Sequence, residues 1–383
     1  MSGTSADGVD IALTQITGHG LDMQAKLLHH HHRPYNAELR SEIFAFRGAD
    51  GGVKSDPLPR LAKLGREISL TYAAAVNEAL SAAHLSATDL SAVAAHGQTL
   101  YHDPPNTIQW LDPSLIAAEV GSPVVSDFRR ADLAAGGQGA PLVPFADYIL
   151  FRHPTKNRVL LNIGGIANIT WLPANCTLDQ VVAFDTGPGN CISDYLCRIH
   201  DPTGPGYDVA GATASRGNPH HDKVRLHLLS HEYFSRRPPK STDGPEMIQA
   251  FESLPLALQP HFGQRDKGSS EDLPDLLAMA DLLTALTIQN AMLDFLPAPV
   301  DEIISSGGGT ANTAIMRFLD LGLAATGRTK RISIHDVGIA AEAKEAIAFA
   351  LLGAATLDGI PSNVPSATGA RKAVVLGSIT PRP

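Results

Sequence analysis

The sequence has few cysteines and no long run of apolar residues. Its three cysteines, Cys176, Cys191 and Cys197, are an odd number and lack the spacing of a metal site, which is typical of a reducing cytosol. No apolar run reaches the length that we expect of a membrane span, and the N-terminus shows no signal-peptide pattern. We therefore expect a cytoplasmic protein without a membrane partner.

Basic charge is also scarce, with 30 Lys and Arg against 39 Asp and Glu and a net charge of −9. This balance argues against nucleic acid as a partner, although a local basic pocket for an acidic small molecule is compatible with it. Charged residues make up 18% of the chain and hydrophobic residues 44%, with 34 Gly and 27 Pro. This composition favours a loop-rich α/β enzyme, and 383 residues suffice for two domains.

The most informative motif runs from Asp185 to Asn190 and reads Asp-Thr-Gly-Pro-Gly-Asn. The flanking residues predict a strand over 181–184 and a helix over 191–199. Glycines let backbone N–H groups approach a ligand closely, and the N-terminus of a helix favours anions. A carboxylate beside a phosphate repels it unless the acid holds a metal ion or takes part in the chemistry. A tight turn capped by Asp185 is the alternative interpretation.

A second loop of small residues opens the chain at 2–8 and precedes a predicted strand over 9–13. Its hydroxyl and glycine residues can bind phosphate oxygens, while Asp7 or Asp10 can hold Mg²⁺ directly or through water. The Gly-Lys-Ser/Thr ending of a Walker loop is missing. Two strands usually flank such a loop, and here the first is absent. Either the chain is shortened at its N-terminus or the loop is held differently.

Two further predicted strands, over 90–95 and 123–126, end in polar residues. The first is followed by His-Gly-Gln-Thr at 96–99, a group suited to the hydroxyls of a sugar. The second is followed by Asp-Phe-Arg-Arg at 127–130 and by a flexible glycine-rich loop at 134–144. Together they predict a pocket for an anionic substrate, with a surface salt bridge as the alternative for the arginines.

The second half of the chain repeats this outline. A strand over 158–168 is broken by Gly164 and Gly165, which indicates a hairpin or a close backbone approach. A glycine triplet at 307–309 opens a predicted helix and can seat the sugar or a phosphate of a nucleotide. We interpret the similar outline of the two halves as a sign of internal duplication. The four histidines at 29–32 predict a solvated turn, and the polar stretch 217–272 predicts an irregular connection with short helices.

Taken together, these loops resemble actin- and hexokinase-type phosphotransferases, in which two ribonuclease-H-like α/β domains surround a central nucleotide cleft. More specifically, the sequence resembles the anhydro-N-acetylmuramic acid kinase family. The matching stretches follow the family's order at 2–10, 96–99, 127–130, 135–144, 162–168, 185–190, 307–312 and 344–350. The resemblance implies one domain formed by 1–135 with about 350–383, and a second formed by 136–349.

The resemblance also implies a reaction, the ATP-dependent conversion of 1,6-anhydro-N-acetylmuramic acid to N-acetylmuramic acid 6-phosphate. Asp185 would activate the water that opens the anhydro bridge at the anomeric carbon, while O6 takes the γ-phosphoryl group. Arg130 would orient Asp185 or meet the lactyl carboxylate of the substrate. Asp7 and Glu345 would hold Mg²⁺. The family further implies a homodimer whose domains close over nucleotide and sugar, with the phosphates between the two phosphate loops.

The resemblance implies two sets of binding residues. The ATP-binding residues would be Gly3, Thr4, Ser5, Asp7, Gly8, Asp10, Asn162, Gly164, Gly165, Asn168, Thr186, Gly187, Gly189, Asn190, Gly307, Gly308, Gly309 and Asn312. The sugar-binding residues would be His96, Gly97, Gln98, Thr99, Arg129, Arg130 and Glu345.

Two other functions fit the same motifs. Levoglucosan kinase, a relative that opens the same bridge in plain anhydroglucose, shares stretches at 153–156 and 343–347. Arg130 and the glycine pair at 136–137 favour the muramic substrate, because the levoglucosan branch has an apolar residue and an arginine there. Gln-Trp-Leu-Asp at 109–112 departs from the muramic kinases, which usually have Gly after the Gln. A non-catalytic sugar sensor is the third interpretation, and the retained phosphate loops and acids disfavour it.

Overall fold

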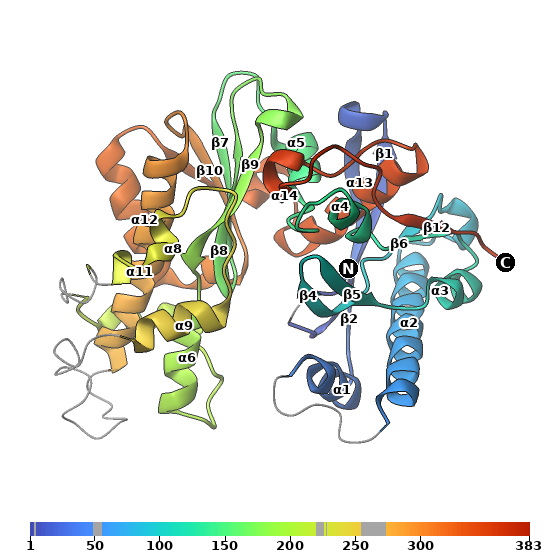
Figure 1. Ribbon diagram of the computed structural model, residues 1–383, viewed down its shortest axis with the longest axis horizontal. Coiled ribbons are helices and arrows are strands. Elements are labelled where there is room, and N and C mark those ends of the chain that lie inside the picture. Colours follow the sequence, from blue (N-terminus) through green and yellow to red (C-terminus); the bar gives the residue numbers. More distant parts are fainter. Residues whose placement is uncertain (4, 49–55, 220–225, 227, 254–272) are drawn as a thin grey trace. The chain divides into compact units, whose positions relative to one another are not determined.

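The computed structural model describes residues 1–3, 5–48, 56–219, 226, 228–253 and 273–383, and the chain divides into two compact units (Figure 1). The first unit is Met1–Phe151 with Ile339–Pro383, and the second is Arg152–Gly338. Both combine helices with small sheets, so the α/β expectation is confirmed. The sequence-based boundaries lie elsewhere, at 135/136 and about 350. The difference arises because helices α5 (Pro144–Phe151) and α13 (Lys344–Leu357) pack on each other within the first unit.

The strands of the first unit are β1 (Gly8–Thr17), β2 (Gln24–Pro34), β3 (Val93–Ala94), β4 (Gln98–Asp103), β5 (Asn106–Trp110), β6 (Val124–Ser126) and β12 (Ser378–Thr380). β1 and β2 form one antiparallel pair, and β4 and β5 form another. β6 lies between β3, which runs parallel to it, and β12, which runs antiparallel. Most of these strands are short, and the helices supply much of the apolar surface that covers them.

The helices of the first unit are α1 (Ala37–Arg47), α2 (Pro57–Ala82), α3 (Pro113–Val120), α4 (Arg130–Ala134), α5 (Pro144–Phe151), α13 (Lys344–Leu357) and α14 (Pro365–Thr368). The long helix α2 begins with a proline in its first turn, where no intrahelical N–H is needed. Leu64, Ile68, Tyr72 and Val76 recur every fourth residue and are buried, so they form the stripe that faces the core. α2 packs on α3 and on the β1–β2 pair.

The histidine run at 29–32 lies in strand β2, so the expected solvated turn is wrong. His29 to His32 pair in register with β1, and His32 is the partner of Asp10. His32 Nδ1 lies 3.0 Å from the carboxylate of Asp10, and His31 Nε2 lies 2.9 Å from Glu78 on α2. Cross-strand and helix partners that are distant in sequence therefore stabilise a strand that local composition does not predict.

The strands of the second unit are β7 (Arg158–Ile163), β8 (Ile166–Leu172), β9 (Val182–Pro188), β10 (Glu302–Ser306) and β11 (Lys330–Ser333). They form one mixed sheet in the order β11-β10-β7-β8-β9. β7, β8 and β9 are successive antiparallel strands, whereas β10 runs parallel to both β7 and β11. This arrangement is the one expected of a ribonuclease-H-like domain.

The helices of the second unit are α6 (Cys191–His200), α8 (Glu232–Ser235), α9 (Gly244–Glu252), α11 (Leu273–Phe295) and α12 (Thr313–Thr326). α11 and α12 pack side by side against the sheet (Figure 1). The core between them contains Trp171 of β8, which is 1% exposed, together with Ile288 of α11 and Leu319 of α12. This layer fixes the sheet whose strand ends carry the polar motifs.

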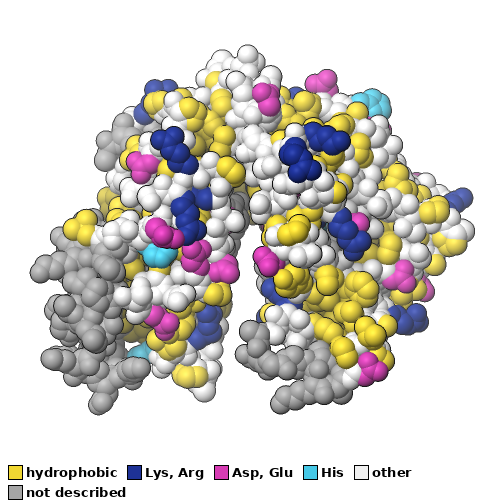
Figure 2. Space-filling view, in the orientation of Figure 1, with side chains coloured by type: hydrophobic (Ala, Val, Ile, Leu, Met, Phe, Trp, Pro, Cys, Tyr) yellow, Lys and Arg dark blue, Asp and Glu magenta, His cyan; other side chains and the backbone are white. Residues whose placement is uncertain are grey.

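Helix α11 has the length and mean hydropathy, 1.5, of a membrane span. The expectation that no apolar run reaches that length is therefore wrong. In the structure, 61% of the apolar window is buried inside the protein, as in the core helix of a globular domain. The face of the protein that Figure 2 shows carries acidic and basic side chains interspersed with hydrophobic ones.

Candidate functional site

A row of polar residues crosses the sheet of the second unit. Asn162 on β7 is the register partner of Asn168 on β8, which is in turn the partner of Asp185 on β9. Ser306, the last residue of β10, pairs with Asn162 on the other side. Directly paired residues of neighbouring strands point to the same face of a sheet, so these side chains form one polar row. Asp185 thus lies inside β9, whereas the sequence predicted a strand that ends before it.

Two turns of the second unit pack against each other beside this row. Gly164 and Gly165 form the turn of the β7–β8 hairpin. The carbonyl of Gly164 accepts hydrogen bonds from the backbone N–H (2.8 Å) and the side-chain amide (3.1 Å) of Asn190. The carbonyl of Gly165 accepts from the N–H groups of Gly189 (2.9 Å) and Cys191 (3.0 Å). Both the predicted hairpin and the predicted close backbone approach are confirmed.

Packing leaves no room for a side chain at Gly189 or at Gly307. A Cβ atom on Gly189 would lie 2.3 Å from a carbonyl oxygen of the hairpin turn, and one on Gly307 would lie 2.6 Å from the carbonyl oxygen of Ile163. Gly307 also has a φ of +88°, which favours glycine. Gly165 and Gly308, in contrast, have open space where a side chain would be. Their backbones are therefore accessible to a ligand.

Thr186 and Gly187 support the loop from within the second unit. Thr186 is buried, and its hydroxyl donates to the carbonyl of Ala167 (3.1 Å). A Cβ atom on Gly187 would lie 2.7 Å from the ring of Phe234. The side chain of Thr186 is thus used internally, which leaves backbone groups as the candidates for contact with ATP.

Asp185 is anchored through its carboxylate and through both of its backbone polar groups. Its Oδ2 accepts a hydrogen bond from the N–H of Thr242 (3.0 Å). Its backbone carbonyl accepts the hydroxyl of Tyr233 (2.6 Å), and its N–H donates to the carbonyl of Lys240 (3.1 Å). Burial raises the pKa of Asp185 to about 6, against the opposing effects of the Thr242 N–H and the Lys240 ammonium. A fixed carboxylate with such a pKa is suited to accept a proton near neutral pH.

Asn312 caps helix α12. Its Oδ1 accepts from the N–H groups of Ala314 (3.0 Å) and Ile315 (3.2 Å), and its Nδ2 donates to the buried Asp281 (2.9 Å). Burial is the main cause that raises the pKa of Asp281 to about 7. The side chain of Asn312 therefore holds the Gly307–Asn312 turn in place. Next to this turn, α12 borders a shallow cavity of about 490 Å³.

In the first unit, Met1 and Ser2 hold the N-terminal loop. Met1 and Asp10 exchange backbone hydrogen bonds, from the Met1 ammonium to the Asp10 carbonyl (2.7 Å) and from the Asp10 N–H to the Met1 carbonyl (2.8 Å). The hydroxyl of Ser2 donates to Gln98 Oε1 (2.6 Å), while Gln98 Nε2 donates to the carbonyl of Gly3 (3.0 Å). These bonds place the loop along the edge of β1 that does not pair with β2.

The acidic end of this loop faces solvent. Asp7 is exposed and accepts a hydrogen bond from the hydroxyl of Ser5 (2.9 Å). Gly8 begins β1 at a point where a Cβ atom would lie 2.3 Å from the carbonyl oxygen of Arg33. Thr4, which was also expected to bind ATP, lies outside the described residues. The accessible candidates here are thus Ser5 and Asp7.

The expected sugar-binding tip at 96–99 is largely internal. His96 and Gln98 are buried, whereas Thr99 is half-buried. Arg129 Nε donates to His96 Nε2 (3.2 Å), which leaves the ring proton on Nδ1, where it donates to the carbonyl of Gly97 (2.8 Å). Burial and, after it, the charge of Arg129 hold the pKa of His96 well below its usual value. The neutral ring therefore serves to position Arg129.

Charged groups gather around the start of α13. Removal of water from around the carboxyl group of Glu345 raises its pKa, and the nearby charge of Asp10 raises it further. The side chain as a whole is nevertheless exposed. Lys344, the Met1 ammonium and Arg129 act in the opposite direction. Burial lowers the pKa of Arg129 to about 10 and that of the Met1 ammonium to about 6. The structure therefore brings the predicted residues Asp10, Arg129 and Glu345 into one electrostatic cluster.

Arg130, the first residue of α4, is more exposed than Arg129. Its side chain is 63% exposed, and its Nε lies 3.4 Å from Asp127 Oδ1. An exposed pair of this kind contributes less than about 1 kcal/mol to stability. The surface salt bridge considered from the sequence is thus present, and its weakness leaves the guanidinium free to exchange Asp127 for a ligand carboxylate.

A buried carboxylate fixes the glycine-rich loop between α4 and α5. Asp132 Oδ2 accepts from the N–H of Gly139 (2.8 Å), while its Oδ1 accepts from the side chains of Asn363 (2.7 Å) and Thr368 (2.7 Å). A Cβ atom on Gly137 would lie 2.2 Å from Oδ2, so a larger residue there would displace the carboxylate. The expectation of a flexible loop is therefore wrong, because Asp132 ties the loop to residues near the C-terminus.

Substitution of Asp132 by Asn should reduce the free energy of unfolding by about 1–2 kcal/mol. The new amide nitrogen must face one of the three donors, which leaves a buried donor without an acceptor. Urea unfolding of Asp132→Asn and the unaltered protein measures the loss. The exposed Asp179 offers a matched control, since Asp179→Asn should unfold like the unaltered protein. Equal stability of all three proteins would refute the role of Asp132.

The carboxylates can also be compared with what a magnesium ion requires. Among the described residues, no group of three or more His, Cys, Asp or Glu side chains is placed to hold a metal ion. Mg²⁺ at a nucleotide site, however, needs only one or two carboxylates, with phosphate oxygens and water as its other ligands. Asp7 and Glu345, which are both exposed, are donors of this kind, so the residues present fit the ion.

Sequence reasoning missed several residues that surround Asp185. Tyr233, Lys240 and Thr242 belong to the stretch 217–272, for which an irregular connection with short helices was expected, and all three bond to Asp185. The short helices α8 and α9 lie in this stretch, whereas 220–225, 227 and 254–272 are outside the described residues. Ser306 joins the polar row through the register of β10 with β7. The lysine and the tyrosine of this proline-rich segment were the available signal. The sequence alone does not show that the segment lies against β9, because only the tertiary fold brings the two together.

Comparison with known proteins gives these loops a context. The sequence profile of the anhydro-N-acetylmuramic acid kinase family matches residues 1–382. Proteins named anhydro-N-acetylmuramic acid kinase from Bacillus cereus and Bacillus thuringiensis subsp. konkukian are each 39% identical to the chain, over 390 and 393 residues. Both alignments cover 99% of this chain and 97% of the relative.

Among solved structures, component A of the (R)-2-hydroxyglutaryl-CoA dehydratase of Acidaminococcus fermentans aligns with 89% of this chain and 96% of its own. Its sequence identity is 13% and its TM-score 0.39, a likeness too low to support any conclusion. The family match and the curated relatives extend over nearly the whole sequence and include every loop described above. The chain belongs to the anhydro-N-acetylmuramic acid kinase family.

Proposed function

We propose that this protein uses ATP to open the 1,6-anhydro ring of anhydro-N-acetylmuramic acid hydrolytically and to phosphorylate O6. The product is N-acetylmuramic acid 6-phosphate. The observation that carries the proposal is Asp185, an anchored carboxylate whose pKa is raised to about 6, in line with the polar row and beside glycine-lined turns. The substrate follows from membership of the family.

The reaction uses Asp185 as a general base. Its carboxylate takes a proton from water, and the water oxygen forms a bond to the anomeric carbon of the sugar. The bond between that carbon and the bridging oxygen breaks. The bridging oxygen stays on C6 and takes the γ-phosphoryl group of ATP, and ADP leaves. Proton, water and phosphoryl group are thereby all accounted for.

The glycine loops are the candidates for ATP. Gly165 and Gly308 have open space at their α-carbons, so phosphate or ribose oxygens can approach their backbones. In the first unit, Ser5 and Asp7 lie on the exposed part of the N-terminal loop. Asp7 and Glu345 would hold Mg²⁺, which neutralises charge on the phosphates when bound. The sugar would meet Thr99, Arg129 and Arg130. A homodimer and a cytoplasmic location complete the proposal.

The rate should depend on pH through Asp185. Only the ionised carboxylate can accept a proton, so kcat/KM should fall as the pH drops through about 6. The fall should be tenfold for each pH unit below that value. Measurement of kcat/KM between pH 4.5 and 8, with ATP saturating, gives the position of this acid limb of the pH profile. A limb near pH 4, where an ordinary aspartate titrates, would contradict the raised pKa.

An assay of ADP release tests the proposed reaction. Purified protein is given ATP and Mg²⁺ with anhydro-N-acetylmuramic acid, with levoglucosan, or with no sugar. We expect ADP release that depends on sugar and is faster, by kcat/KM, with the muramic substrate. Faster turnover of levoglucosan would assign the protein to plain anhydroglucose. Absence of turnover with either sugar, in protein that binds ATP, would support a sensor and refute the kinase.

A further inference from the structure

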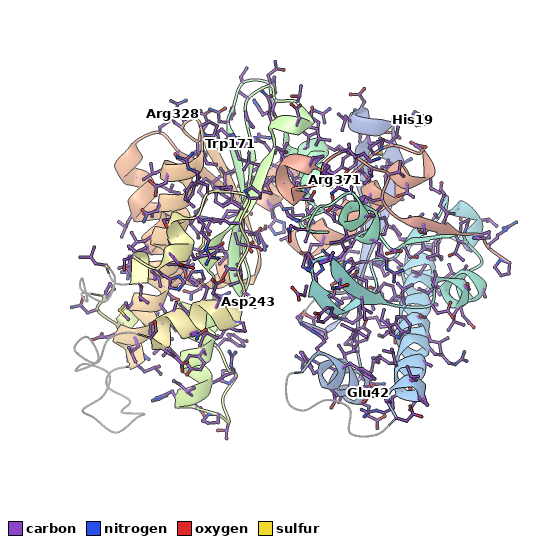
Figure 3. The ribbon with its side chains drawn as sticks, in the orientation of Figure 1. His19, Glu42, Trp171, Asp243, Arg328 and Arg371 are labelled. Atoms are coloured by element: carbon purple, nitrogen blue, oxygen red, sulfur yellow. The ribbon has the colours of Figure 1, made fainter. Side chains whose placement is uncertain are left out.

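The apolar helix α11 carries three buried polar side chains at every third position. Asp281, Thr284 and Thr287 are each no more than 2% exposed. Residues three apart are neighbours on a helix surface, so the three side chains follow one another along a polar stripe. Ile288 of the same helix belongs to the core that contains Trp171 of β8, which is labelled in Figure 3. Packing of that apolar core does not account for the polar stripe.

The two threonines of the stripe face the loop that follows Asp185. The hydroxyl of Thr284 donates to the backbone carbonyl of Gly189 (2.8 Å), and this hydrogen bond is buried. The hydroxyl of Thr287 donates to the carbonyl of Thr284 (3.0 Å), and a Cβ atom on Gly187 would lie 3.2 Å from it. Helix α11 therefore contacts the loop at both of its glycines.

Asp281 faces the glycine turn at 307–312 and holds it through Asn312. Its Oδ2 accepts from Asn312 Nδ2 (2.9 Å), and the backbone N–H of Asn312 donates to the carbonyl of Gly309 (3.0 Å). The two loops also approach each other, since a Cβ atom on Gly309 would lie 3.0 Å from Nδ2 of Asn190. One helix thus anchors two loops that are far apart in the sequence.

We propose that Asp281 and Thr284 are positioning residues for the reaction, which fix the glycine turn at 307–312 and the Asp185 loop relative to each other. Asp281 acts through Asn312 and Thr284 through Gly189. The proposal rests on the proposed contact of these loops with ATP and on the proposed role of Asp185. Rates depend steeply on the placement of the reacting groups, so a common anchor for both loops affects catalysis directly.

The cost of Asp281 to the fold supports a role in function. Burial raises the pKa of its carboxyl to about 7, against the hydrogen bond from Asn312. A carboxyl whose pKa is higher in the folded than in the unfolded chain binds more protons when folded. The folded protein therefore loses stability as the pH rises from about 4 to about 7. An apolar residue would avoid this loss, so the turn that Asp281 holds explains the acid better than core stability does.

Asp281→Leu should weaken the binding of ATP about tenfold and change kcat at saturating ATP much less. The substitution removes the acceptor for Asn312 Nδ2, so the turn loses its anchor while the Asp185 loop keeps its own. Asp281→Asn still offers an oxygen to that amide and should retain most of the affinity. Titration calorimetry with ATP and steady-state kinetics measure the two effects. Asp281→Ala takes the place of the leucine variant if that variant does not fold.

Thr284→Val should lower kcat about tenfold with a smaller change in the KM for ATP, because the carbonyl of Gly189 loses its donor. Thr284→Ser keeps the hydroxyl and should keep kcat, and Thr284→Ala replaces the valine variant if that variant does not fold. Thr356→Val is the matched control, since Thr356 of the first unit is buried and donates to the carbonyl of Leu352 (2.9 Å). An equal loss of kcat in Thr284→Val and Thr356→Val would refute the role of Thr284.

A double-mutant cycle tests whether Asp281 acts through Asn312. In protein that carries Asn312→Ala, the further change Asp281→Leu should weaken ATP binding by much less than tenfold, because the amide that it holds is gone. Additive losses would overturn the positioning role of Asp281.

Gly308→Leu separates this proposal from the proposed function. Gly308 has open space at its α-carbon, so a leucine fits the fold but would obstruct ATP at the turn. Weak ATP binding in Gly308→Leu, with normal binding in Asp281→Leu and normal kcat in Thr284→Val, would overturn the positioning roles and leave the turn as an ATP contact. Normal ATP binding in Gly308→Leu would refute the turn as an ATP contact, and the role of Asp281 with it.

Discussion

Asp185→Asn is expected to lower kcat by about 10²–10⁴-fold while the affinity for ATP stays nearly unchanged. Asparagine has the same size and can still accept the hydrogen bond from the N–H of Thr242 at its carbonyl oxygen. It cannot accept a proton from water at any pH in the working range. Because the substitution keeps the loop and removes only the basicity, the loss should be in kcat more than in ATP binding.

Asp194 provides a matched control for this substitution. It lies on α6 of the same unit, and burial raises its pKa to about 6 as well, so it matches Asp185 in the direction and the main cause of the pKa shift. Asp194→Asn should retain most of the activity. Steady-state kinetics gives kcat for both variants, and titration calorimetry gives ATP affinity. Near-normal turnover in Asp185→Asn, or an equal loss in both variants, would rule out Asp185 as the base.

Arg130→Ile is expected to separate the two anhydrosugars. If the guanidinium meets the lactyl carboxylate, the charge-assisted contact is worth roughly 1.5–3 kcal/mol, so kcat/KM for the muramic substrate should fall about tenfold or more. Levoglucosan has no carboxylate, and its kcat/KM should change much less. The weak exposed pair with Asp127 implies little loss of stability.

The measurement is the ratio of kcat/KM for the two sugars in each variant. Arg66→Ile, on the exposed side of α2, removes another exposed arginine of the same unit and should leave the ratio unchanged. Equal losses on both sugars in Arg130→Ile would mean that the arginine serves Asp185 or the fold and does not read the substrate.

Much of the fold was accessible from the sequence because its signals are local. The residues after the Asp185 motif predict a helix over 191–199, and the structure has α6 (Cys191–His200) there. The glycine pair at 164–165 predicts a hairpin, and the structure has one. Strand β2 escaped prediction, since its histidines are stabilised by β1 and by Glu78, neither of which is near in sequence. Tertiary partners overrode local composition there.

The candidate site likewise contains residues that local motifs reveal and residues that only the tertiary fold reveals. Asp185 and the glycine turns carry their chemistry in a few consecutive residues, so the motif pointed to them. Asp132 did not stand out, because its significance depends on Asn363 and Thr368, more than two hundred residues away. Thr284 was hidden for the same reason, since only the fold brings α11 beside the carbonyl of Gly189. His96 pointed to a sugar, yet its ring bonds to Arg129.

The most direct test of the account follows the bridging oxygen of the substrate. Anhydro-N-acetylmuramic acid labelled with ¹⁸O in the 1,6 bridge is converted with ATP, and the ³¹P resonance of the product is recorded. Attack of water on the anomeric carbon leaves the bridging oxygen on C6, so the ester oxygen next to phosphorus should be ¹⁸O and the resonance should show the isotope shift. An unshifted product would mean that the bond to C6 is broken instead, and would contradict the proposed reaction.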